Sequence, residues 1–200
     1  MKRLGLTGGI ATGKTWVAEK LRELGFHVLD ADSVGHKLMR PGQAAFSEIV
    51  EFFGPEILSA DGSIDRKELG AIVFADAAKL AKLNSILHPK IEAAMNEQFE
   101  AWRAAGITDP VFAEAALLVE AGMHERLDGL VVVWCTPTQQ LNRLVARGLK
   151  EPEARRRIAL QLPSEEKLKH ATYRIDTSGT FEQSQRQIEE LAKKLRNASP

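Results

Sequence analysis

Residues 8–15 have the types and spacing needed to hold a phosphate group. They read Gly8-Gly9-Ile10-Ala11-Thr12-Gly13-Lys14-Thr15 and match the pattern G-x-x-x-x-G-K-[ST]. Gly8 and Gly13 allow successive backbone N–H groups to surround phosphate oxygens, and the N-terminus of a following helix adds a favourable dipole. Lys14 can then reach the β- and γ-phosphates of a nucleotide, while the Thr15 hydroxyl is placed to bind Mg²⁺. We therefore expect this loop to bind ATP together with Mg²⁺.

Two other interpretations of the glycine-rich segment are a dinucleotide-binding loop and a turn that only caps a helix. A dinucleotide-binding loop needs the pattern G-x-G-x-x-G, but position 10 is Ile, and Lys14 would have no role there. The strand-like run before the segment and the amphipathic helix pattern after it disfavour a simple capping turn. Both flanks therefore favour the phosphate-binding interpretation.

Two carboxylates, Asp30 and Asp32, follow a second short apolar run that reads as a strand. Ligands of open α/β sheets bind at the carboxyl ends of the strands, and side chains two positions apart on an extended chain point the same way. Phosphoryl transfer to an alcohol needs a group near the acceptor hydroxyl and help in holding Mg²⁺. We predict Asp32 as the catalytic base and Asp30 as a magnesium ligand, directly or through water. The alternative is that Asp32 is only the N-cap of the next helix.

Short apolar runs alternate with helical patterns along the chain, which indicates an α/β fold. The run Leu130 to Trp134 has almost no polar alternation, which is typical of a parallel sheet covered on both faces. A helix ended by Gly25 follows the phosphate loop, and another helix closes the chain. The order predicts a doubly wound sheet with strands at 4–6, 28–30, 111–113, 130–134 and 173–176.

Two regions interrupt this alternation. Residues 34–108 are mostly helical and predict an inserted helical domain between the second and third strands. Residues 147–170 are rich in charge, contain two prolines and predict a short helical lid. The nucleotide-binding core then consists of residues 1–33 and 109–200. The last residues, 197–200, read as a loose tail.

The composition argues against several classes of protein. The 27 Lys and Arg residues equal the 27 Asp and Glu residues, so nothing favours broad binding to nucleic acids or membranes. The single cysteine, Cys135, lies in an apolar run, forms no disulfide framework or zinc site, and fits a reducing compartment. We find no long apolar span and no cleavable signal pattern. We expect a cytoplasmic protein that is a monomer or a small homo-oligomer.

The order of the motifs resembles the dephospho-CoA kinase family over nearly the whole chain. The phosphate loop alone is generic, whereas the ordered series of matching segments is specific. The segment Leu117-Leu118-Val119-Glu120 is similar to the family's Pro-Leu-Leu-Phe-Glu. The other matches are Leu6 to Ile10 with Gly13-Lys14, Asp30-Ala31-Asp32, Ile64-Asp65-Arg66, Val73-Phe74, His88-Pro89, and in the lid region Gln140, Arg143, Arg147, Arg157-Ile158 and Gln161.

This resemblance implies that ATP phosphorylates the ribose 3′-hydroxyl of dephospho-CoA to give coenzyme A. It also implies a five-stranded parallel sheet, a coenzyme-binding insert and a mobile lid. Asp32 falls on the family's proposed base, and Ala11 to Trp16 falls on its ATP phosphate site. The predicted ATP-binding residues are Gly8, Gly9, Ala11, Thr12, Gly13, Lys14, Thr15, Trp16 and Arg143. The chain departs from the family pattern at Trp16, Ala116, Thr172 and Thr177.

Five further side chains are candidates for binding or catalysis. Arg143 and Arg147 lie four residues apart on one helix face, and lid arginines can neutralise charge on a transferring phosphoryl group. We predict Arg147 as catalytic, with a solvated surface charge as the alternative for either arginine. Arg66, His88 and Glu120 are predicted to contact the substrate. Their alternatives are a local ion pair, a helix break at Pro89, and a role in ordering the sheet edge, respectively.

Two other functions remain open. One is a P-loop kinase for a small acceptor such as shikimate, gluconate or a nucleoside monophosphate, although so long an insert suits a long acceptor such as a pantetheine nucleotide. The other is a regulatory GTPase-like switch, which would need an Asn-Lys-x-Asp motif that does not occur. The switch-like segment Asp176-Thr177-Ser178-Gly179 lies near the C-terminus and reads as a turn.

Overall fold

The computed structural model describes residues 1–197 and consists of two compact units. The first unit contains Met1–Asp30 and the chain from Phe99 onwards, and the second contains Ala31–Gln98. These divisions lie three residues before the one expected at 33/34 and ten residues before the one expected at 108/109. The predicted tail lies outside the described residues from position 198 on, and Asn197 is the last residue of a helix rather than part of a tail.

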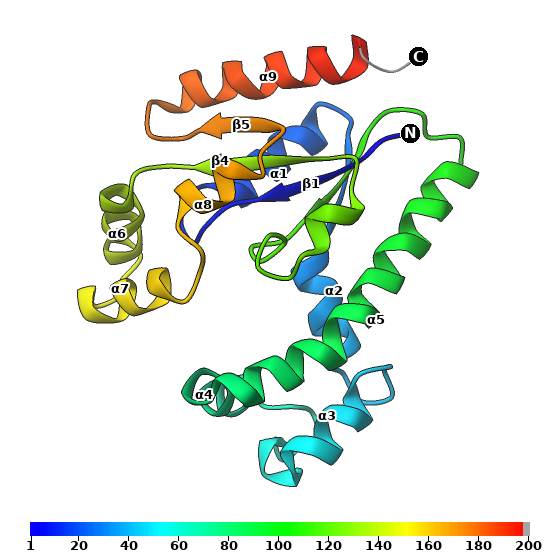
Figure 1. Cartoon of the computed structure of the whole chain (residues 1–200), viewed down its shortest axis with the longest axis vertical. Coiled ribbons are helices and arrows are strands. Elements are labelled where there is room, and N and C mark those ends of the chain that lie inside the picture. The colour runs from blue at the N-terminus through cyan, green and yellow to red at the C-terminus, as the bar shows by residue number, and fades with distance from the viewer. Residues whose placement is uncertain (198–200) are drawn as a thin grey trace. The chain divides into compact units, whose positions relative to one another are not determined.

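A five-stranded parallel sheet forms the centre of the first unit (Figure 1). The strands lie at the predicted positions: β1 at Arg3–Thr7, β2 at His27–Asp30, β3 at Val111–Glu114, β4 at Gly129–Trp134 and β5 at Tyr173–Asp176. They are ordered β2-β3-β1-β4-β5, and every neighbouring pair is parallel. The predicted fold class is therefore confirmed. Because β2 and β3 pair with Asp30 opposite Glu114, two carboxylates lie side by side at the carboxyl edge of the sheet.

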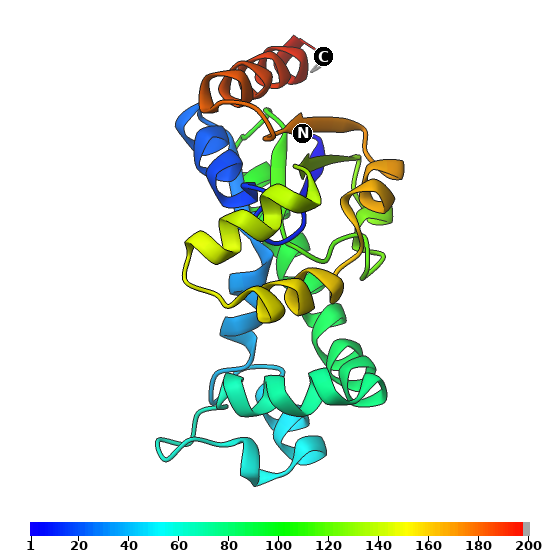
Figure 2. The same cartoon turned by 90° about the vertical axis from the view of Figure 1, so that its left-hand side faces the viewer.

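Helices cover both faces of this sheet, as the apolar strands require. Helix α1, Lys14–Glu23, and helix α9, Phe181–Asn197, pack on one face, where residues such as Leu21, Ile188 and Leu195 join the core. Helix α8, Ser164–Lys169, and the short helix η2, Met123–Arg126, belong to the other side (Figure 2). Helix α6, Pro137–Ala146, begins with a capping box at Thr136, and helix α7, Glu151–Ala159, follows it.

The second unit is helical and has its own hydrophobic core. It contains α2 at Ala31–Leu38, α3 at Phe46–Phe53, the short helix η1 at Pro55–Ile57, α4 at Arg66–Ala75 and most of α5 at Ala77–Ala104. The apolar faces of these helices meet in a cluster that includes Ile49, Ile57, Leu69, Val73 and Ile86. Each unit therefore buries its own set of apolar side chains.

Helix α5 contradicts the helix break at Pro89 that the sequence suggested as an alternative. His88-Pro89 does not break the helix, because α5 continues for 28 residues with Pro89 inside it. Proline removes one backbone hydrogen bond and disfavours a helix interior, but the apolar side chains on either side of this position pack into the core of the second unit. Tertiary packing therefore outweighs the local signal here. Within residues 1–197, no helix is both long enough and apolar enough to cross a membrane.

Candidate functional site

The phosphate loop, residues 8–15, joins β1 to α1. Gly8 and Gly13 are each required in it, for different structural reasons. Gly13 has a φ of 93°, in the left-handed region that favours glycine, directly before the first turn of α1. A Cβ on Gly8 would overlap the Val133 carbonyl and lie 2.7 Å from the Thr12 hydroxyl oxygen. Any side chain at either position would therefore distort the loop.

Ala11 is the one described residue other than glycine with a positive φ, 60°. This conformation costs an alanine roughly 1–2 kcal/mol, so the surroundings must stabilise it. The guanidinium of Arg143 donates to the Ala11 carbonyl at 3.1 Å, and the Thr12 hydroxyl donates to the Gly9 carbonyl at 2.8 Å. The hydroxyl of Thr177 donates to the Thr12 carbonyl at 2.6 Å. Side chains from α6 and from the end of β5 thus hold the loop in a strained shape.

Lys14 forms an ion pair that the sequence analysis did not include. Its ammonium lies 2.8 Å from a carboxylate oxygen of Glu114, whose other oxygen lies 3.5 Å from Arg22. The Glu114 side chain is only 5% exposed, so water screens this pair weakly. The same logic that selected Asp30, a carboxylate at the end of a buried strand, would also have found Glu114. The positive charge of Lys14 is therefore balanced by the carboxylate of Glu114 at the end of β3.

The structure changes the local interpretation of Asp30 and Asp32. Asp30 is the last residue of β2, but Asp32 lies in the first turn of α2, so the two residues do not share an extended segment as the sequence analysis assumed. Asp32 is inside the helix rather than at its cap, and it belongs to the second unit. Thr15 is an exposed residue at the second position of α1. The predicted base and the predicted magnesium ligand thus belong to different elements.

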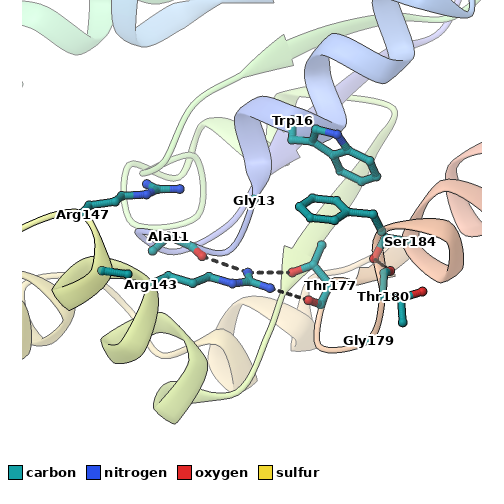
Figure 3. Close-up of a pocket in the computed structure, with 11 residues that line it drawn as sticks. Ala11, Gly13, Trp16, Arg143, Arg147, Thr177, Gly179, Thr180 and Ser184 are labelled. Carbon is teal, nitrogen blue, oxygen red and sulfur yellow. Dashed lines mark hydrogen bonds between the residues drawn. The ribbon is translucent and has the colours of Figure 1, made fainter.

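A cavity of about 460 Å³ adjoins the phosphate loop within the first unit (Figure 3). This volume is in the range of small-molecule sites, about 300–1,000 Å³. Arg143 reaches from α6 across one side, where it bonds the Ala11 carbonyl and the Thr177 carbonyl and hydroxyl. The lining brings together the predicted residues Ala11, Gly13, Trp16, Arg143 and Arg147.

An aromatic pair lies at the same cavity. Trp16 contacts Phe181 with ring centroids 5.4 Å apart and the planes at 64°. Phe181 is 72% exposed, so much of its surface is accessible to a ligand. Phe181 and Ser184 could not be recognised as lining residues from the sequence, and Thr177 was noted only as a departure from the family pattern and as part of a turn, because nothing in the linear pattern places the start of α9 beside the phosphate loop. A planar apolar group could pack in this part of the cavity.

Glu120, predicted to contact substrate, is engaged within the first unit. Its carboxylate lies 2.7 Å from the ammonium of Lys167 and accepts a hydrogen bond from the Leu162 N–H at 3.0 Å. Lys167 is fully buried and also donates to the Ala116 carbonyl at 2.6 Å. These bonds fix the segment after α7 to the loop that follows β3. The geometry favours the ordering role that the sequence analysis kept as an alternative.

The remaining predicted residues lie on helices. Arg147 ends α6 as its C-cap, at the start of the predicted lid. In the second unit, Arg66 is exposed as the first residue of α4, which Asp65 caps by accepting from two backbone N–H groups. His88 is partly buried in α5, and burial lowers its pKa below the ordinary 6.5. A neutral imidazole at physiological pH follows from that shift.

Known proteins resemble this chain in both sequence and fold. The pattern of the dephospho-CoA kinase family matches residues 3–183. Dephospho-CoA kinases of Geobacillus kaustophilus and Aquifex aeolicus are 44% and 42% identical over 92% and 98% of this chain, and over 92% and 98% of their own lengths. The crystal structure of TT1252 from Thermus thermophilus has a TM-score of 0.83 at 32% identity, with 97% of both chains covered. Dephospho-CoA kinase from Campylobacter jejuni has a TM-score of 0.73 at 28% identity, covering 99% of this chain and 98% of that one.

Proposed function

The chain belongs to the dephospho-CoA kinase family, and on that premise we propose how its residues transfer the γ-phosphate of ATP to the ribose 3′-hydroxyl of dephospho-CoA. The observation that carries the proposal is the strained loop of residues 8–15, which contains Lys14 and adjoins a cavity of nucleotide size. Transfer of this kind depends mainly on positioning and on neutralising charge.

The nucleotide is proposed to bind entirely within the first unit. The backbone N–H groups of the loop and the dipole of α1 hold the phosphates, and Lys14 exchanges its contact with Glu114 for the γ-phosphate. The adenine occupies the cavity beside Trp16 and Phe181, where an aromatic face favours stacking. Arg147, which lines the same cavity, neutralises charge that develops during transfer.

Mg²⁺ fits the donors that the chain offers. The hydroxyl of Thr15 and the carboxylates of Asp30 and Glu114 are hard oxygen ligands, and Mg²⁺ in kinases is held by one or two carboxylates together with substrate phosphates and water. We propose that Thr15 and Asp30 hold it, with Glu114 as a further carboxylate at the neighbouring strand end. The ion supplies positive charge that offsets the β- and γ-phosphates.

The acceptor is proposed to involve the helical unit of residues 31–98. Asp32, two residues after the carboxyl end of β2, takes the proton from the ribose hydroxyl as general base. Arg66 is exposed and can pair with the diphosphate of the coenzyme. His88 stays neutral and can only bind as a hydrogen-bonding group, because burial lowers its pKa.

An acceptor screen tests this function. Purified protein with ATP and Mg²⁺ is supplied separately with dephospho-CoA, shikimate, gluconate and nucleoside monophosphates, and ADP formation is followed. We expect turnover with dephospho-CoA alone, and Asp32→Asn should lower that turnover by about 10²–10⁴-fold while leaving ATP affinity nearly intact. Faster turnover with any of the small acceptors would refute the proposal. Near-normal turnover of the Asp32→Asn enzyme would refute the assignment of the base.

A further inference from the structure

A glutamine in the predicted lid is bonded directly to the backbone of the phosphate loop. Gln161, in the connection between α7 and α8, accepts a hydrogen bond from the Ile10 N–H through its side-chain oxygen at 2.7 Å. On the other side of the same residue, the Ile10 carbonyl accepts from the side-chain nitrogen of Gln140 in α6 at 2.8 Å. Both backbone polar groups of Ile10 are therefore held by glutamine side chains from different segments.

Gln140 and Gln161 bind the residue directly before Ala11, which is the strained residue of the loop. Ala11, with its φ of 60°, follows Ile10 directly, and Arg143 holds the Ala11 carbonyl at 3.1 Å. The fit is close, because a Cβ on Gly9 would lie 2.7 Å from the Gln140 side-chain nitrogen. Ala11 thus keeps its disfavoured conformation while it and Ile10 are bonded to three side chains, of which only Gln161 comes from the predicted lid.

The segment that carries Gln161 is fixed at its other end. The N–H of Leu162 donates to Glu120 at 3.0 Å, and the buried ammonium of Lys167 donates to Glu120 and to the Ala116 carbonyl. Gln161 is therefore presented from an anchored segment. Its amide is also uncharged, so it can accept from the loop without placing negative charge beside bound phosphates.

We propose that Gln161 is a positioning residue that keeps the phosphate loop preformed for nucleotide by holding the Ile10 N–H and, through it, the left-handed conformation of Ala11. The inference rests on the proposed binding of ATP at this loop. A preformed cradle binds its ligand more tightly, because binding then has no ordering cost to overcome. Loss of the Gln161 bond should raise the Kd and KM for ATP and leave the KM for dephospho-CoA unchanged.

Gln161→Met tests the bond itself, since methionine keeps the length of the side chain and loses the acceptor. We expect the Kd of a non-hydrolysable ATP analogue, measured by calorimetry, and the KM for ATP to rise about tenfold. The KM for dephospho-CoA should stay within about twofold. Gln185→Met, an exposed glutamine of α9, is the matched control and should match the parent protein.

The same substitution in an Ala11→Gly background tests the link to backbone strain. Glycine adopts a positive φ readily, so in that background Gln161→Met should raise the Kd of the analogue by less than about threefold. Equal effects in both backgrounds would overturn the inference. So would a Gln161→Met enzyme that binds the analogue as tightly as the parent or more tightly, because Gln161 would then be neutral or would compete with phosphate. A parent protein that binds no nucleotide would instead refute the proposed function, and this inference with it.

Discussion

At the scale of single residues, Glu114 is the carboxylate that balances the charge of Lys14 in the phosphate loop. It is buried, it holds Lys14 at 2.8 Å, and it lies opposite Asp30 in the sheet register. If it also supports Mg²⁺ as proposed, Glu114→Gln should raise the Mg²⁺ concentration needed for half-maximal activity by about tenfold. Magnesium titrations at saturating ATP measure this. Glu23→Gln, which removes an exposed partner of Lys20, is the control, and equal magnesium dependence in both variants would contradict the role.

His88 gives a second prediction at this scale. Burial lowers its pKa below 6.5 in the folded protein, so below that pH the unfolded chain binds a proton that the folded chain rejects. The contribution of His88 to stability is therefore fully present above pH 6.5 and is lost as the pH falls toward the lowered pKa of the folded state. Urea unfolding at about pH 7.5 and about pH 5.5 should show a smaller difference for His88→Gln than for the parent protein. An identical pH dependence would contradict the shift.

At the scale of elements, the segment after α7 depends on the buried ion pair between Lys167 and Glu120. Lys167→Met keeps the bulk of the side chain but leaves the Glu120 carboxylate without its cation, so we expect a loss of about 2–3 kcal/mol in the free energy of unfolding. Urea denaturation measures this loss. Lys169→Met, on the same helix but 66% exposed, should change stability by less than about 0.5 kcal/mol. If both variants lose the same free energy of unfolding, the buried Lys167–Glu120 pair does not contribute to stability as proposed.

The strands could be predicted from sequence because each is a short apolar run with little alternation. Their spatial order could not, since β3 lies between β2 and β1 although a long insert separates it from both along the chain. The same non-local pairing hid the contact of Thr177 with the phosphate loop, because its partner Thr12 is 165 residues away in sequence. Local signals predicted the strand, loop and helix around residues 8–15, because the glycine spacing and both flanks are consecutive in sequence. They failed at Pro89, where packing overrides the local preference.

At the scale of the whole molecule, the chain divides its two proposed substrates between two units with separate cores. A ligand that binds only the folded state stabilises it by about 2.7 kcal/mol at 100 times its Kd. In hydrogen-exchange mass spectrometry, we therefore expect a non-hydrolysable ATP analogue to slow exchange in residues 8–15 and 137–147. Dephospho-CoA should slow exchange within residues 31–98. Protection by dephospho-CoA confined to the first unit would contradict the proposed role of the helical unit.

Trp16 lines the cavity beside Phe181 and thereby gives the protein an optical reporter of its own (Figure 3). The emission of an indole ring depends on what lies against it, so a purine entering the cavity would change the brightness of this tryptophan. The chain contains three tryptophans, and replacing Trp102 and Trp134 with phenylalanine would leave Trp16 as the only tryptophan. Nucleotide titrations could then be followed by light alone, without a coupled assay or an attached dye.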